Sequence, residues 1–175
     1  MEALLMEIDA ILSTTADRWK HLVNTLPAAL LERNPEPGEW SAVECLQHMV
    51  DAEKLVFPVR IRAFLKGENF SNIDPDALVA QNKGLRSAGD LVKEFSELRA
   101  SNLKLLSTLK AADLPRTAQH SALGKVSLKE LLNNWAGHDL LHLVQAERAI
   151  MQPFIKESGP WRKYYKDQDV EKKPG

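Results

Sequence analysis

Apolar residues recur at three- and four-residue steps along four stretches of this chain, the spacing that places side chains on one face of an α-helix. The first stretch covers residues 4–26, and the second begins at Ser41 and continues past Pro58, where we expect a kink. The third covers residues 87–109 and the last covers residues 127–151. The pattern therefore predicts four long amphipathic helices around a shared core.

Two of these helices have well-marked starts. Ser41 with Glu44, and Ser127 with Glu130, each form an S-x-x-E capping box. In such a box the two side chains satisfy backbone amides that the first helical turn leaves without partners. We therefore expect helices to begin at these two serines.

The connections between the helices differ in length. Residues 67–88 are rich in Gly, Pro, Asp and Asn and contain only a short possible helix at residues 76–81. Such a long crossover argues against simple up-down-up-down connectivity. We interpret residues 116–126 as a second loop and find no convincing strand. The sequence thus predicts an all-α fold with a single four-helix bundle over residues 1–153.

The remaining residues, 154–175, are short and mostly polar. Trp161, Tyr164 and Tyr165 suggest that part of this tail packs back on the bundle, and we expect its charged end to fray.

Composition excludes several kinds of partner and location. The 175 residues are 44% hydrophobic and 27% charged, with a formal charge of −1, so neither nucleic acid nor an anionic membrane is an expected partner. No apolar run approaches the ~18 residues that span a bilayer, and the first residues are acidic where a signal peptide would be basic. A single cysteine, Cys45, allows no intrachain disulfide. We expect a cytoplasmic protein.

His138 and His142 form an H-x-x-x-H motif on the last predicted helix. Residues four apart on a helix lie close enough for two imidazole nitrogens to reach one metal ion. Such pairs also arise by chance, and a site needs a third ligand from another helix. His48 borders the core of the second helix, where a hydrogen-bonded interior histidine is the alternative to a ligand. His21 and His120 are expected on the surface.

The run PGEWSAVECLQHMVDAE, followed about ninety residues later by HDLLHLVQAE, resembles the bacterial DinB/YfiT-like superfamily of metal-dependent proteins. The resemblance covers roughly residues 4–152. It implies that His48, His138 and His142 are the metal ligands, with nickel or zinc as the ion. It also implies an up-down-down-up helix order, a dimer and, from related branches, group transfer involving low-molecular-weight thiols. Leu141 is a departure, because many relatives carry another histidine there.

Residues near these histidines suggest supporting roles. Glu44 and Asp139 are candidates to accept hydrogen bonds from the ligand imidazoles and so fix their tautomers, and Gln145 is a candidate for the same role or for contact with substrate. All three suit an ordinary polar helix surface equally well. Trp40 and Trp135 are candidates to wall a pocket, with core packing as the alternative. No catalytic side chain is identified. Cys45 has apolar neighbours that suit an inert buried thiol.

Two classes of function remain open. The first is a metal-dependent enzyme acting on a small-molecule substrate, with a transferase that uses a small thiol favoured over a hydrolase. The second is a non-catalytic metal-binding bundle, for example one related to stress. Three neutral imidazoles leave a divalent ion with an open coordination position, which favours the enzyme.

The outer face of the last helix predicts a homodimer. Its middle carries Gly137, Leu140, Leu141, Val144 and Met151 where a monomeric bundle would show mostly charges. The alternative is that the crossover or the aromatic tail covers this face within the same chain.

Overall fold

The computed structural model describes residues 2–71 and 86–171. Its main helices are α1 (Glu2–Thr25), α3 (Ala42–Leu55), α4 (Phe57–Lys66), α6 (Ala88–Leu106) and α7 (Leu128–Lys156). The shorter elements are α2 (Ala28–Leu31), the 3-10 helices η1 (Ala111–Asp113) and η2 (Gly159–Tyr165), and the strands β1 (Thr117–His120) and β2 (Gly124–Ser127).

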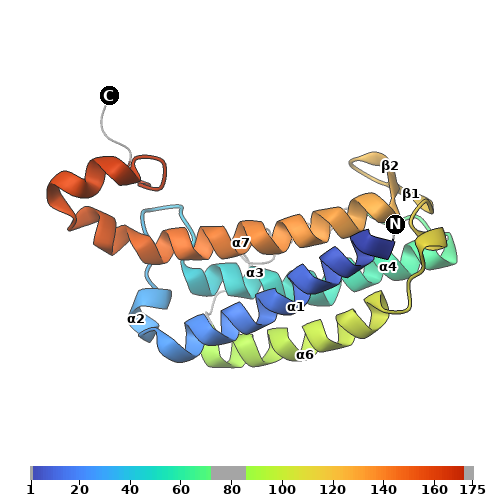
Figure 1. Cartoon of the computed structure of the whole chain (residues 1–175), viewed down its shortest axis with the longest axis horizontal. Coiled ribbons are helices and arrows are strands. Elements are labelled where there is room, and N and C mark those ends of the chain that lie inside the picture. The colour runs from blue at the N-terminus through green and yellow to red at the C-terminus, as the bar shows by residue number, and fades with distance from the viewer. Residues whose placement is uncertain (1, 72–85, 172–175) are drawn as a thin grey trace.

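The long helices form a four-helix bundle, in which α4 extends α3 (Figure 1). Helices α1 and α7 run in one direction and α3 and α6 in the other, which is the up-down-down-up order. Each of α1 and α3 packs against both α6 and α7, so α1 lies diagonally opposite α3, and α6 lies diagonally opposite α7. Helix α4 ends at one end of the bundle and α6 begins at the other, as expected of two parallel helices (Figure 1). The short helix expected at residues 76–81 lies outside the described residues.

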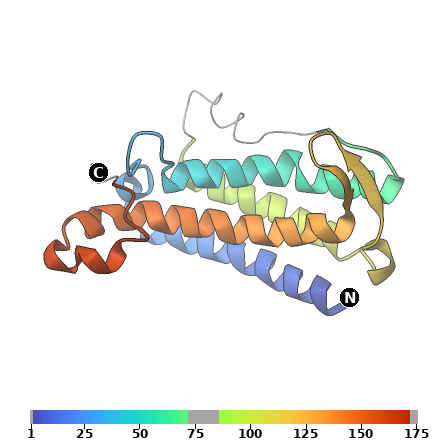
Figure 2. The same ribbon diagram turned by 90° about the horizontal axis from the view of Figure 1, so that it is seen from above.

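The predicted loop at residues 116–126 is instead a β-hairpin, so the prediction that the chain has no strand was wrong. Strands β1 and β2 pair antiparallel, with Thr117 opposite Ser127, and Gly124 adopts a positive φ of 76° at the turn. Alternate residues of β1 are buried, which is the period of a strand. The hairpin lies across the end of the bundle where α7 begins (Figure 2). His120, expected on the surface, is therefore only 5% exposed.

Local sequence explains the helix boundaries. Both predicted capping boxes are present: the Glu44 amide donates to Ser41 Oγ at 3.2 Å, and the Glu130 amide donates to Ser127 Oγ at the same distance. The second helix breaks at Val56, because Pro58 lacks the amide that would continue its hydrogen bonds.

Helix α7 passes through Pro153 and ends at Lys156, beyond the predicted end. The tail then folds back by its backbone: the carbonyl of Gln168 accepts from Arg148 and Gln152, and the amide of Val170 donates to Gln152. The aromatic residues do not make this contact, since Trp161 is 66% and Tyr164 is 72% exposed.

The core consists of two apolar clusters separated by a polar layer. One cluster lies toward the hairpin and includes Leu12, Phe57 and Leu132; the other includes Trp19 and Leu143. Among the described residues, no helix is long and apolar enough to cross a membrane.

The polar layer between the clusters is centred on Arg99 of α6, which is 1% exposed. Its guanidinium donates to Glu53 of α3, to Asp139 of α7 and to the Leu12 carbonyl of α1. One side chain thereby connects all four helices of the bundle.

Candidate metal centre

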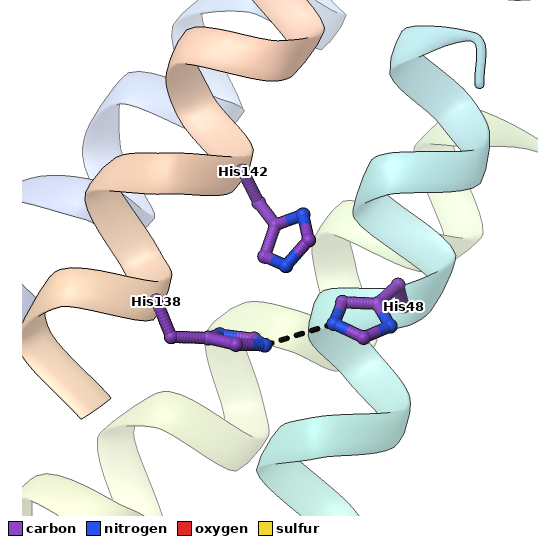
Figure 3. A group of neighbouring side chains, drawn as sticks. All are labelled: His48, His138 and His142. Carbon is purple, nitrogen blue, oxygen red and sulfur yellow. Dashed lines mark hydrogen bonds between the residues drawn. The ribbon is translucent and has the colours of Figure 1, made fainter. Parts of the chain in front are cut away.

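The structure brings His48 of α3 together with His138 and His142 of α7 (Figure 3). Their Nε2 atoms are 2.8 Å apart for His48 and His138, and the nearest ring nitrogens of all three histidines lie within 4.8 Å of one another. The two histidines of α7 face the same side because they are separated by about one helical turn. The antiparallel helix α3 supplies the third imidazole from opposite them.

The three imidazoles lie away from bulk solvent, and burial keeps the ring of His138 neutral at physiological pH. His48 is 3% and His142 is 8% exposed, and His138 is partly buried. Burial, together with the neighbouring His142, His48 and Arg99, lowers the pKa of His138 from 6.5 to about 3. A neutral imidazole retains the lone pair that a metal ion requires.

Gln145 lies one turn beyond His142 and contacts it directly. The Nδ1 of His142 is 2.9 Å from Gln145 Oε1, an atom that can only accept, so His142 donates from Nδ1. Its Nε2 is then left with the lone pair for a metal. Gln145 thus lies beside a candidate ligand and accepts a hydrogen bond from it.

Glu44 and Asp139 make other contacts than expected. The carboxylate of Glu44 accepts from the Ser41 amide at 2.7 Å and from Asn34 at 2.5 Å, so it caps α3. Asp139 is completely buried and receives two hydrogen bonds from Arg99, at 2.6 and 3.0 Å. Asp139 points into the polar layer because adjacent residues on a helix diverge by about 100°.

A pocket of about 520 Å³ reaches the three histidines. Trp40 is part of its wall, with its ring 5.3 Å from His48 and 6.2 Å from His142. Trp135 does not line this pocket, and core packing, the alternative considered for it, describes its position. It is fully buried, stacks on Phe57 at 5.1 Å and donates from Nε1 to Glu53 at 2.7 Å, so it belongs to the core.

Sequence reasoning missed three polar residues of the pocket wall, Arg60, His120 and Asn134. Arg60 lies one turn beyond Val56 on the same helical face, and Asn134 one turn before His138, so helical spacing could have found both. His120 lies in the unpredicted hairpin, where only the alternation of a short strand could have indicated it.

Cys45 does not take part in this centre. It is completely buried, and burial raises the pKa of its thiol to about 12. A thiol that stays protonated at neutral pH is a poor nucleophile and a poor metal ligand.

The donor atoms fit a divalent transition-metal ion. Two nitrogens bound to one zinc ion lie about 3–4 Å apart, because each Zn–N bond is about 2.0–2.1 Å. The spacing of the three imidazoles approaches this requirement. In addition, the Nδ1 atom of His138 is buried and has no hydrogen-bond partner within the described residues, which is uncommon for a purely structural polar group.

The fold and this centre define a class of protein: a helical bundle with a candidate three-histidine metal centre formed by two antiparallel helices. The family model of the DinB superfamily matches residues 11–146, a range that contains all three histidines. The chain belongs to the DinB superfamily.

The structure is also similar to that of YfiT from Bacillus subtilis, which is described as a probable metal-dependent hydrolase with an unusual four-helix bundle topology. The TM-score is 0.73 at 16% sequence identity, over 86% of this chain and 87% of YfiT. At this identity the likeness shows the fold alone. No curated protein matches the chain.

Proposed function

We propose that this protein is a metal-dependent enzyme, and that hydrolysis of a small molecule is the reaction the site supports best. The observation that carries the proposal is the convergence of His48, His138 and His142 where a pocket of about 520 Å³ reaches them. A metal needed only for folding is usually closed off by its protein ligands, whereas a catalytic metal keeps a position open. The description of YfiT as a probable hydrolase supports the same reaction class.

The residues of the chain have separable roles in this proposal. The three histidines hold the ion, and Gln145 orients the ring of His142 through the 2.9 Å contact. A divalent ion held in this way lowers the pKa of a bound water or thiol and polarises a substrate carbonyl. Trp40 and Phe57 supply apolar walls that exclude water from a bound substrate.

Thiol-dependent group transfer is the second candidate, and one feature favours it. A further pocket of about 330 Å³ shares Trp40, Leu141 and Gln145 with the first. A transferase binds two reactants, and two adjoining pockets beside one centre suit a small thiol and an electrophile. The same ion would then act by acidifying the thiol.

Nickel and zinc are the ions that we propose, since imidazole nitrogen suits both. Elemental analysis of protein purified without added metal identifies the ion. A non-catalytic metal-binding bundle remains the alternative, and it predicts bound metal with no turnover.

The test compares metal-loaded wild type with His48→Ala, using a panel of aryl esters and amides and, separately, a small thiol with an aromatic electrophile. We expect metal-dependent turnover that His48→Ala abolishes. His21→Ala is the matched control, because His21 is an exposed histidine of α1, and Cys45→Ser should also retain activity. Ester or amide cleavage identifies a hydrolase, and thiol consumption alone identifies a transferase. Equal rates with and without metal would contradict both.

A further inference from the structure

Arg60 of α4 is a partly buried cation with no anionic partner among the residues that the structure describes. It is part of the pocket wall, and its Nε atom is buried with no hydrogen-bond partner within the described residues. The guanidinium lies over the ring of Phe70, 5.6 Å from the centroid. Burial lowers the pKa of Arg60, so desolvation is not offset by a neighbouring carboxylate.

The other buried or partly buried arginines of the described chain have polar partners. Arg99 contacts two carboxylates, and Arg162 pairs with Asp169. Arg18 pairs with Glu147, and Arg148 donates to the carbonyl of Gln168. A desolvated guanidinium costs free energy unless an anion compensates it. In the described part of the chain, no carboxylate or carbonyl oxygen compensates Arg60 in this way.

His120 presents a second donor to the same pocket. Its Nδ1 accepts the backbone amides of Ala122 and Leu123, at 3.1 and 3.2 Å. A neutral imidazole that accepts at Nδ1 carries its hydrogen on Nε2. Burial and the nearby Arg60 lower the pKa of His120, which keeps the ring in this neutral form.

The hairpin holds this donor beside Arg60. The amide of Phe70, just after α4, donates to the carbonyl of Gln119 at 3.2 Å, and the ring of Phe70 meets His120 edge-on at 5.5 Å. Phe70 thus contacts both Arg60 and His120. Ala122 and Leu123 of the hairpin turn line the pocket as well.

This end of the pocket carries one positive charge, that of Arg60. Asn134 of α7 adds an amide to Arg60 and His120, and no acidic side chain is among the described residues that line the pocket. One guanidinium with two neutral groups matches a single negative charge, and a planar guanidinium matches a carboxylate by two parallel hydrogen bonds.

We propose that Arg60 and His120 form a subsite that binds the carboxylate of the substrate. This inference rests on the proposed function, because the three histidines are taken to hold the ion beside which the substrate reacts.

The distance between the histidines and Arg60 along the pocket indicates the size of the substrate. Phe57 lies against His138, with ring centroids 5.3 Å apart, and Arg60 follows three residues later on the same helix, a rise of about 4.5 Å. Ala52, Val56 and Phe57 give the wall between them an apolar character. The substrate is thus a small monocarboxylic acid with a short apolar connector between its carboxylate and its reactive group.

The test measures binding of two thiols that differ only in charge, 3-mercaptopropionate and 3-mercaptopropionamide, to cobalt-loaded protein by its visible absorption. Wild type should bind the carboxylate at least about tenfold more tightly than the amide, as expected of a charge-assisted hydrogen bond. Arg60→Met should remove this preference and leave amide binding unchanged, while Arg60→Lys should retain part of it. Arg62→Met is the matched control, since Arg62 is exposed on the same helix. No preference in wild type, or a preference that survives Arg60→Met, overturns the subsite.

A second measurement separates this inference from the proposed metal centre. In metal-free protein, the Nε–H resonance of Arg60 is followed by nuclear magnetic resonance during titration with butyrate or butyramide. Butyrate should shift the resonance and butyramide should not. If cobalt does not bind but butyrate shifts Arg60, the proposed function fails and the subsite stands; if cobalt binds and butyrate has no effect, the subsite fails alone.

Discussion

His138 and Asp139 are neighbours on α7, yet they belong to two buried polar clusters of opposite character. Asp139 enters the layer of Arg99 and Glu53, where the charges are paired and hydrogen-bonded. His138 enters a group of three imidazoles that presents nitrogen lone pairs to a pocket. The first cluster is closed within the bundle, and the second is open to a ligand.

The difference predicts that the Arg99 layer stabilises the fold and that the histidine cluster binds a metal ion. A buried ion cluster is strongly destabilised when one partner is removed, because the remaining charges lose their compensation. Buried neutral imidazoles carry no charge to compensate. We therefore expect substitutions in the Arg99 layer mainly to lower the free energy of unfolding. Substitutions in the histidine triad should mainly weaken metal binding.

The largest expected effect is the loss of metal from His142→Ala. Removing one of three nitrogens should abolish stoichiometric binding, measured by elemental analysis after dialysis, while the helical circular dichroism of the protein is preserved. His21→Ala should bind as wild type does. Unfolding of the metal-free variant would instead show that the triad is structural.

Replacing Arg99, the centre of the closed cluster, should instead destabilise the fold. Arg99→Met leaves Glu53 and Asp139 buried without a cation, so the free energy of unfolding in urea should fall by about 3–5 kcal/mol. Arg18→Met is the control, because Arg18 pairs with Glu147 at the surface, where both side chains are more than 40% exposed, and it should change stability by less than about 1 kcal/mol. A similarly small loss for Arg99→Met would refute the assignment of a structural role to this layer.

The pH dependence of metal-free protein tests the environment of His138. Its folded-state pKa is about 3 and its ordinary value is 6.5, so the unfolded chain takes up the proton first as pH falls. The stability present above pH 6.5 should therefore be lost as pH falls toward 3, by roughly 2–4 kcal/mol after allowance for partial exposure. Denaturant unfolding between pH 7.5 and 4 measures this, and His138→Phe should show a flatter profile. An unchanged slope in that variant would exclude His138 as the source.

A smaller effect is expected at Gln145, which supports the triad without binding the ion. Gln145→Leu removes the acceptor for His142 and should weaken metal affinity by about 10–100-fold in competition with a chelator. Glu44→Gln is the comparison, since the carboxylate of Glu44 caps α3 and accepts from Ser41 and Asn34, and it should leave affinity unchanged. If both substitutions changed metal affinity equally, Gln145 would have no specific role in orienting His142.

The last prediction concerns the outer face of α7 and should leave both clusters intact. Leu140, Leu141 and Val144 are 42%, 61% and 55% exposed, so the described part of the chain leaves them largely uncovered. We propose that the last helices of two copies pack here about a twofold axis. Light scattering should find a dimeric wild type and a monomeric Leu140→Glu, Val144→Lys variant with normal metal content. A monomeric wild type would disprove this interface.

Local signals in the sequence determined the helices and their starts. Ser41 with Glu44 and Ser127 with Glu130 act on backbone groups within one turn, so their effect does not depend on the rest of the fold. The facing of His138 and His142 to one side follows from helical geometry alone. The assignment of His48 came from family resemblance, because no local rule connects residues ninety positions apart.

Only the tertiary structure decided how polar side chains inside the bundle are divided. Arg99 and Glu53 meet through the packing of α3 on α6. Arg99 also binds the carboxylate of Asp139, which helical geometry turns about 100° away from His138. The hairpin likewise depends on backbone pairing between two short strands and contact with Phe70, which single-strand patterns do not encode. The burial of His120 and the unpaired state of Arg60 are consequences of that packing, since burial and charge compensation depend on which segments meet in space.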